Sequence, residues 1–233
     1  MGGINNQEDG GDTINGGSRR RNHNRLLTIM TTNAQSLKNK MEEFDILVNK
    51  RKPHIISVTE SWGKEWINDA KFSLKGYTMY RNDRKGAKGG GALLYVSNRI
   101  EQRICRQLNS QNFDSSSWCW INEKGGKKIL VGSVYRSTSS TADNDKLLLE
   151  MIEKASNIAG ENRLLILGDF NVPKVNWNNR DIKTGAKAID TQMLEKANDC
   201  YLHQHVREET RFRNDESSML DLIFTKEEED VNK

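Results

Sequence analysis

The 233-residue sequence contains few cysteines and no long apolar run. Its three cysteines, Cys105, Cys119 and Cys200, are widely spaced, which argues against a disulfide framework and a Cys-x-x-Cys metal motif. No stretch reaches the roughly 18 consecutive apolar residues that a membrane-spanning helix requires. Residues 1–25 are polar and lack the apolar segment of a signal peptide. We therefore expect a soluble protein of a reducing compartment, either nuclear or cytoplasmic.

Signatures of three enzyme classes are missing as well. Segment 81–91 is rich in glycine, but no Gly-Lys-Ser/Thr follows it at the start of a helix, as a phosphate-binding P-loop requires. The sequence has no Gly-x-Ser-x-Gly motif of the α/β-hydrolases and no cysteine cluster for zinc. His203 and His205 alternate on an expected strand, where a structural role is favoured over metal binding.

The formal net charge is +4, and the positive excess is unevenly distributed. Arginines gather in segment 19–25, whereas segment 227–230 is entirely acidic. This distribution permits binding to a polyanion but does not demonstrate it. Because the sequence shows no internal repeat, we expect a disordered polar segment over 1–25, one domain over 26–225 and an acidic tail over 226–233.

The segment Arg163–Asn171 is the clearest structural signal. Four apolar residues run into Gly168, a pattern typical of a strand that is buried on both faces and ends at the edge of a sheet. If the chain stays extended, the side chains of Asp169 and Asn171 point the same way. A carboxylate and an amide placed together suit cation or phosphate chemistry. A plain turn after a strand is the alternative at this stage.

Strands and helices are expected to interleave without strict alternation. Segments 26–33 and 54–60 are strands joined by a helix over 37–48 that Ser36 could cap, so Asn33 and Glu60 should lie at one edge. Two hairpins (77–80 with 92–96, and 118–122 with 128–135), two helices (146–159 and 188–200) and a last strand (219–225) follow. This order favours mixed sheets with helices outside. The tryptophans, Trp62 included, are interpreted as packing residues.

Polar side chains recur where the expected strands end. The set comprises three acids, two amides and a phenol, which together suit one divalent cation and one phosphate: Asn33, Glu60, Tyr135, Asp169, Asn171 and Asp221. Asp221 stands among apolar residues, and burying a carboxylate there is costly unless a partner is present.

Six segments spread along the chain carry a resemblance to a known family. They are 32–37 (TNAQSL), 58–62 (VTESW), 89–96 (GGGALLYV), 134–136 (VYR), 167–171 (LGDFN) and 218–225 (SMLDLIFT). In this order they resemble the endonuclease/exonuclease/phosphatase superfamily, and most closely the apurinic-type endonuclease domain of non-LTR (LINE-like) retrotransposons. The resemblance implies an α/β fold: a four-layer sandwich of two mixed β-sheets flanked by helices.

The resemblance also implies a metal-dependent reaction. Glu60 matches the family's principal Mg²⁺ ligand, with Asn33 beside it, and Mn²⁺ is the alternative cation. Asp169 matches the acid that activates or orients the attacking water. The implied reaction is hydrolytic nicking of one DNA strand, which leaves a 3′-hydroxyl for a linked reverse transcriptase domain to extend.

Three further residues match positions around the scissile phosphate. Tyr135 matches a phenol near the phosphate, Asn171 a partner on it, and Asp221 an acid that orients catalytic groups. The family's final Ser-Asp-His motif has no counterpart, because no histidine follows Asp221. We therefore expect a C-terminally truncated domain with impaired nicking.

The basic loop 81–88 supplies most candidate DNA contacts. If it lies beside the site it can contact the phosphate backbone, although a solvated hairpin turn needs no function. The candidates are Arg81, Arg84, Lys85 and Lys88, with Arg211 added because it precedes Asp221. The alternatives are another phosphatase or phosphodiesterase of the superfamily, or a DNA-binding remnant without activity.

Overall fold

The computed structural model describes residues 26–84, 89–109, 113, 115–123, 126–213 and 216–231. Its helices are α1 (Met41–Arg51), α2 (Arg106–Asn109), α3 (Ala142–Ala159) and α4 (Ala188–Asp199), with 3-10 turns η1 (Asp69–Phe72) and η2 (Glu228–Asp230). Its strands are β1 (Ile29–Asn33), β2 (Ile55–Thr59), β3 (Tyr77–Asn82), β4 (Ala92–Ser97), β5 (Gln102–Ile104), β6 (Ser116–Asn122), β7 (Lys128–Tyr135), β8 (Arg163–Asp169), β9 (Val175–Asn176), β10 (Asp181–Ile182), β11 (His203–Gln204), β12 (Arg211–Arg213), β13 (Glu216–Ser218) and β14 (Asp221–Thr225). Within these ranges no helix has the length and apolar character needed to cross a membrane. The expected segment 1–25 lies outside the described residues.

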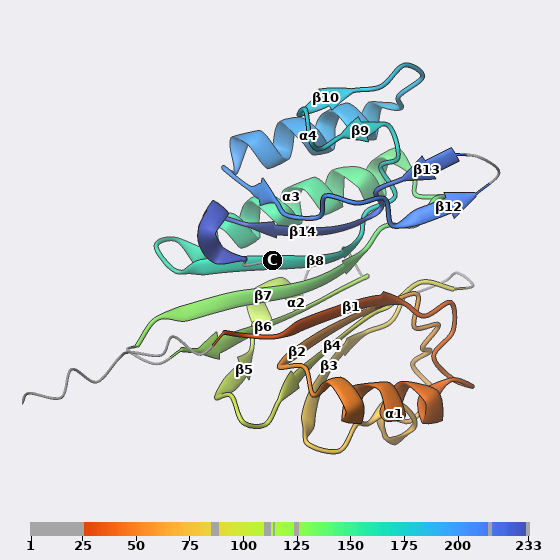
Figure 1. Ribbon diagram of the computed structural model, residues 1–233, viewed down its shortest axis with the longest axis vertical. Helices are drawn as coiled ribbons and strands as arrows, with labels where there is room; N and C mark the ends of the chain where they lie inside the picture. The colour runs from red at the N-terminus through yellow and green to blue at the C-terminus, as the bar shows by residue number, and fades with distance from the viewer. Residues whose placement is uncertain are drawn as a thin grey trace, which may run out of the picture.

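Two mixed sheets carry the architecture. One has the strand order β1-β2-β4-β3, with β1 and β2 parallel and the other neighbours antiparallel. The other has the order β11-β14-β8-β7-β6-β5, with β7 and β8 as its parallel pair. Figure 1 shows α1 below the first sheet and α3 and α4 above the second, so four layers stack on one another. The expected α/β fold of two mixed sheets flanked by helices is confirmed.

Apolar side chains fill each interface between layers. Phe44 and Val48 of α1 pack on the four-stranded sheet, and Leu148 and Met151 of α3 pack on the six-stranded sheet. A third cluster fills the space between the sheets, with members such as Leu94 of β4, Val131 of β7 and Leu167 of β8. Inside that layer the hydroxyls of Ser57 and Ser133 lie 2.7 Å apart and share a hydrogen bond, so each satisfies the other where water cannot reach.

The helix after β1 begins later than the apolar spacing predicts. Ser36 does not cap it: α1 starts at Met41, and Gln35 and Ser36 both have positive φ. The backbone N–H of Ser36 donates to the carbonyl of Glu60 at 2.9 Å, and that of Leu37 to Ser61 at 3.0 Å. This segment therefore runs alongside the loop that follows β2, and the prediction of a Ser36 cap was wrong.

The predicted acidic tail is packed against the fold where it is described. Asp230 in η2 accepts a 2.7 Å hydrogen bond from the guanidinium of Arg163, the first residue of β8. Lys226 donates to the carbonyls of Ser156 and Gly160 at the end of α3, where cations are favoured. Residues 226–231 thus contact the six-stranded sheet and α3.

Candidate active site

The side-chain amide of Asn33 bonds to two carboxylates that belong to different sheets. The Nδ2 of Asn33, the last residue of β1, donates to Glu60 Oε1 at 2.8 Å and to Asp169 Oδ2 at 2.9 Å. Glu60 follows β2 and Asp169 ends β8, so three strand ends meet at this amide. We call this place the rim, defined as the ends of β1, β2, β7 and β8 and the start of β14. It lies at the right-hand side of Figure 1.

Two more predicted residues flank Asp169 within its own sheet. Tyr135 of β7 pairs with Asp169 on one side, and Asp221 of β14 pairs with it on the other. Asp169 is nearly fully buried, and this burial, reinforced by the charge of Asp221, raises its pKa from 3.8 to about 7. The hydrogen bond from Asn33 acts in the opposite direction. Asp169 therefore titrates near neutral pH, which suits proton transfer from water.

Asp221 occupies a different position from the expected one. It opens β14 instead of lying inside the strand, and its backbone N–H donates to Thr210 Oγ1 at 3.1 Å. Its Oδ1 is buried and has no hydrogen-bond partner, and burial raises the pKa of this carboxyl. A buried carboxylate oxygen without a partner is costly, and such an atom marks a place where a ligand can bind.

Tyr135 is mostly buried at the end of β7. Burial, followed by the charge of Glu60, raises the pKa of its phenol to about 12. The phenol therefore stays protonated near neutral pH. In this form it can donate a hydrogen bond to an anion at the rim.

Asn171 does not continue the strand, so the predicted alternation with Asp169 was wrong. β8 ends at Asp169, and Asn171 has a φ of 48°, in the left-handed region. Its side-chain Nδ2 donates to the carbonyl of Arg136 at 2.6 Å, while its backbone N–H donates to Asp169 Oδ1 at 3.1 Å. It is therefore the backbone of Asn171 that contacts Asp169.

Unusual backbone conformations gather at the rim. Glu60, Trp62 and Asn171 all have φ near 50°, which is rare for residues with side chains. Gly168 has a φ of 147°, and a Cβ at this position would lie 1.8 Å from the carbonyl oxygen of Val134. Such conformations cost free energy and concentrate where a site requires them. They indicate a functional site independently of the residue types.

Trp62 belongs to this site, which its interpretation as a packing residue missed. Its indole Nε1 donates to Glu60 Oε2 at 3.4 Å, and its backbone N–H donates to the carbonyl of Gly90 at 3.0 Å. The two carboxylate oxygens of Glu60 thus have separate donors. The signal available in the sequence was only the closeness of Trp62 to Glu60.

Solved structures with a similar fold were found, whereas a comparison with curated protein sequences gave no match. The endonuclease domain of TRAS1, a telomere-specific non-LTR retrotransposon, is 20% identical with a TM-score of 0.66, covering 85% of this chain and 83% of that one. AP endonuclease LMAP from Leishmania major is 12% identical with a TM-score of 0.63, covering 84% and 77%. The APE2 catalytic domain from Xenopus laevis is 11% identical with a TM-score of 0.59, covering 85% and 82%.

The chain has an endonuclease/exonuclease/phosphatase fold. In addition, residues 129–233 match the profile of a family described as endonuclease-reverse transcriptase. That segment contains all of β7 except its first residue, together with β8 and β14, and hence Tyr135, Asp169 and Asp221.

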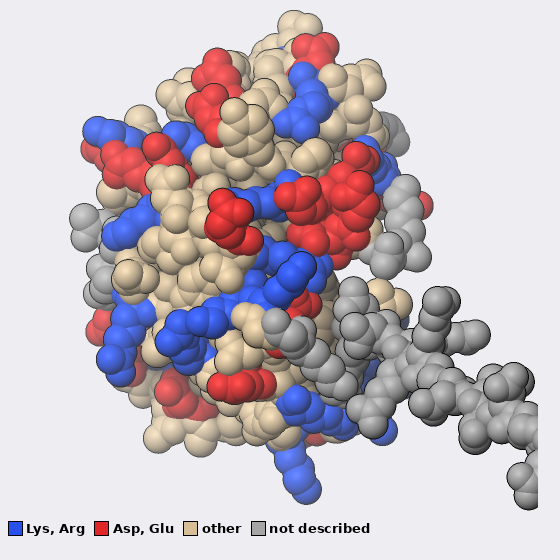
Figure 2. Space-filling model, turned by 90° about the vertical axis from the view of Figure 1, so that its left-hand side faces the viewer, with Lys and Arg blue, Asp and Glu red and all other residues tan. Residues whose placement is uncertain are grey.

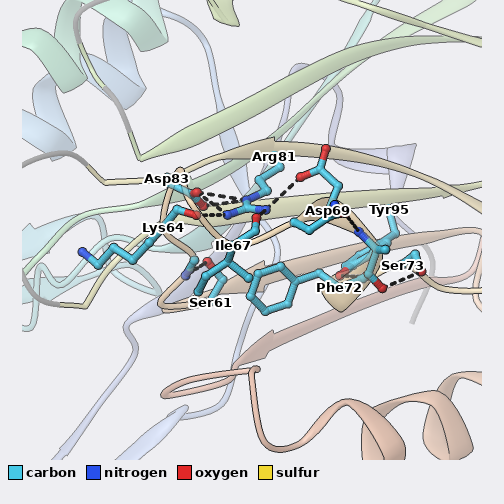
Figure 3. Close-up of polar contacts among 12 residues, drawn as sticks. Ser61, Lys64, Ile67, Asp69, Phe72, Ser73, Arg81, Asp83 and Tyr95 are labelled. Atoms are coloured by element: carbon cyan, nitrogen blue, oxygen red, sulfur yellow. Dashed lines mark hydrogen bonds and ion pairs between the residues drawn. The ribbon is translucent and has the colours of Figure 1, made fainter.

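In this endonuclease/exonuclease/phosphatase fold, Arg81 is not available as a DNA contact. Its side chain is 10% exposed and pairs with Asp83, whose side chain is 8% exposed, and with Asp69 at 2.8 Å. The same guanidinium donates to the carbonyls of Lys64 and Ile67 at 2.6 and 2.7 Å, as Figure 3 shows. Arg81 therefore holds the loop after β2 in place, and its guanidinium is occupied by contacts within the protein.

The other basic candidates differ in position. Arg84 is half-buried, and its charge acts on Tyr135, so it lies close to the rim. Arg211 is exposed in β12, and its charge acts on Asp221. Lys85 and Lys88 lie outside the described residues. Figure 2 shows the opposite end of the molecule, where lysine and arginine side chains lie beside clusters of acidic ones.

The oxygen donors at the rim fit a hard divalent cation. Among the described residues no group of three or more His, Cys, Asp or Glu side chains converges to hold a metal ion. Mg²⁺ does not require such a group, because it is commonly held by one or two carboxylates, with water and substrate phosphate completing its shell. Glu60 and the amide oxygen of Asn33 could supply the protein ligands. The unpartnered Oδ1 of Asp221 is a further oxygen donor at the rim.

Proposed function

We propose that this protein is a Mg²⁺-dependent DNA endonuclease that hydrolyses one phosphodiester bond and nicks one strand. The observation that supports this most is the amide of Asn33, which joins Glu60 and Asp169 from two sheets at 2.8 and 2.9 Å. An all-oxygen set beside a buried acid that titrates near pH 7 suits metal-assisted phosphate hydrolysis.

Each side chain has a role in this proposal. Glu60 and Asn33 would hold the cation, with Mn²⁺ as the alternative to Mg²⁺, and the cation would stabilise the charge that develops on the phosphate. Asp169 accepts a proton from the attacking water, and Asp221 keeps that carboxylate basic through like-charge repulsion. The protonated phenol of Tyr135 donates to a non-bridging phosphate oxygen. Asn171 would affect the phosphate indirectly, because its backbone N–H donates to Asp169 Oδ1.

The cellular setting is part of the proposal. The matched family profile and the TRAS1 neighbour support a retrotransposon-derived protein that works with a reverse transcriptase domain. We place this protein in the nucleus or the cytoplasm. The described histidines, His54, His203 and His205, bond or pair at the opposite ends of their strands from the rim. With no imidazole from the described chain to polarise the phosphate, we expect slow nicking.

The test is relaxation of supercoiled plasmid by the purified chain in Mg²⁺, compared with Glu60→Gln. We expect a slow conversion to the open-circular form that EDTA and Glu60→Gln both abolish. Binding of labelled duplex in Ca²⁺ is measured in parallel. Salt-sensitive binding together with identical background nicking by both proteins would instead favour a DNA-binding remnant. Release of phosphate from a 3′-phosphorylated strand without nicking would favour a phosphatase of the same superfamily.

A further inference from the structure

A buried ion pair lies directly behind the rim and takes no part in the chemistry proposed above. The Nε and Nη2 of Arg136 donate to the two carboxylate oxygens of Asp145 at 2.7 and 2.8 Å. Their side chains are only 6% and 10% exposed. Asp145 lies in the first turn of α3, the helix that covers the six-stranded sheet.

Arg136 also closes a ring of hydrogen bonds with the loop after β8. Its Nη1 donates to the carbonyl of Asn171 at 2.9 Å, and its own carbonyl accepts from Asn171 Nδ2 at 2.6 Å. Its backbone N–H donates to the carbonyl of Asp169 at 2.8 Å. Three bonds therefore tie the residue after Tyr135 to the two ends of the Asp169–Asn171 turn.

This ring fixes a conformation that the chain does not favour by itself. Asn171 has a φ of 48°, in the left-handed region, and in this conformation its backbone N–H donates to Asp169 Oδ1 at 3.1 Å. The bidentate pairing with Asp145 holds the Arg136 guanidinium in one plane, so that its third nitrogen faces the Asn171 carbonyl. A chain of hydrogen bonds thus links Asp145 in α3 to one oxygen of the Asp169 carboxylate, while Asn33 bonds to the other oxygen.

Stability alone does not account for the pair. Replacing a buried ion pair by apolar residues of similar volume is often neutral or stabilising, whereas removing one partner is strongly destabilising. A buried arginine with these partners is expected where the position of a neighbouring loop must be fixed, here that of Asn171. We propose that Arg136 and Asp145 are positioning residues, which hold Asn171 and thereby aim the carboxylate of Asp169 at the attacking water. This inference rests on the proposed nuclease function for its catalytic consequence only.

The main test is the double variant Arg136→Met/Asp145→Leu, which removes both charges and keeps an apolar interior. We expect a folded protein with a melting temperature close to that of the wild type, whose single-turnover nicking rate falls about 100-fold, as expected when a catalytic group shifts by about 1 Å. The DNA concentration for half-saturation should not change, because both side chains are buried. In hydrogen-exchange NMR, the amide of Asn171 should lose protection while the β8 amides keep theirs.

The matched control is Arg163→Met, which breaks two ion pairs, with Glu123 and Asp230, at the start of β8 and thus at the opposite end of that strand from Asp169. This variant should keep both the nicking rate and the protection of the Asn171 amide. Should the double variant fail to fold, Arg136→Lys keeps the charge and cannot make the forked contact, and the same losses are expected. Wild-type rate and unchanged Asn171 protection in a folded variant would overturn the inference. If the wild type does not nick at all, the proposed function fails, and the exchange experiment alone decides whether the pair positions Asn171.

Discussion

Gly168 is the position where one added methyl group should cost most. In the parallel pairing of β7 and β8 it faces Val134, and a Cβ would lie 1.8 Å from the carbonyl oxygen and 2.8 Å from the carbonyl carbon of that residue. Both atoms belong to backbone, so no side-chain rotation relieves the collision. The φ of 147° adds a conformational penalty. A residue in a disfavoured backbone region costs about 1–3 kcal/mol and overpacking about 1–3 kcal/mol, so Gly168→Ala should lose about 2–6 kcal/mol in free energy of unfolding.

The measurement is urea and thermal unfolding followed by circular dichroism. For a domain of this size each kcal/mol lowers the melting temperature by about 2–4 °C, so a fall of roughly 5–20 °C is expected for Gly168→Ala. Gly185→Ala is the control, because Gly185 also has a positive φ, of 78°, but an added Cβ has nothing within 4 Å. The difference between the two variants isolates the collision with Val134. Equal losses in both would refute the reasoning.

Three further outcomes follow from buried or charged groups. Burial raises the pKa of Asp169 to about 7, so its contribution to the free energy of unfolding is complete below about pH 4 and is lost as the pH rises through about 7. Between pH 5 and 8 the urea midpoint of the metal-free protein should therefore fall more than that of Asp169→Asn. Equal falls would contradict this. Ser57→Ala and Ser133→Ala should each cost about 1–3 kcal/mol, since each leaves a buried hydroxyl unpaired, whereas the double variant should cost less than their sum; additive losses in a double-mutant cycle would argue against the bond. Arg84→Ala should weaken DNA binding and lower the salt-dependence slope by about one unit, as measured by fluorescence anisotropy, and an unchanged slope would remove Arg84 from the phosphate contacts.

The sequence predicts best what depends on strand periodicity. Asn33 and Glu60 could be assigned to one edge because a strand, a helix and a second strand imply parallel neighbours, and β1 and β2 pair in that way. The end of β8 at Asp169 follows equally from an apolar run that meets a glycine. Patterns of this kind place residues along an element, and parallel strands then bring their ends together.

Residues in left-handed backbone conformations could not be predicted in the same way. Ser36 has the side chain of a helix cap and Asn171 the spacing of an extended strand, yet both have positive φ because long-range hydrogen bonds decide their conformation. The exposure of Arg81 was also predicted wrongly. Arg81 stands in a charged, glycine-rich segment that suggests solvent exposure, while its carboxylate partners lie up to 12 positions away and give no periodic signal. Arg136 likewise depends on Asp145, a partner that no motif reveals.

Asn33 donates hydrogen bonds to carboxylates from both sheets. The geometry of the candidate site therefore depends on the distance between the two sheets. Glu60 and Asp169 are attached to different sheets, and the spacing of those sheets is set by the side chains packed between them, such as Leu94 and Leu167. Packed protein interiors compress little, so one extra methylene in that layer would shift the backbone of both sheets. Substitutions far from the rim can therefore separate the two carboxylates without touching either one. Hydrophobic residues between the sheets thus limit how far apart the two carboxylates can lie.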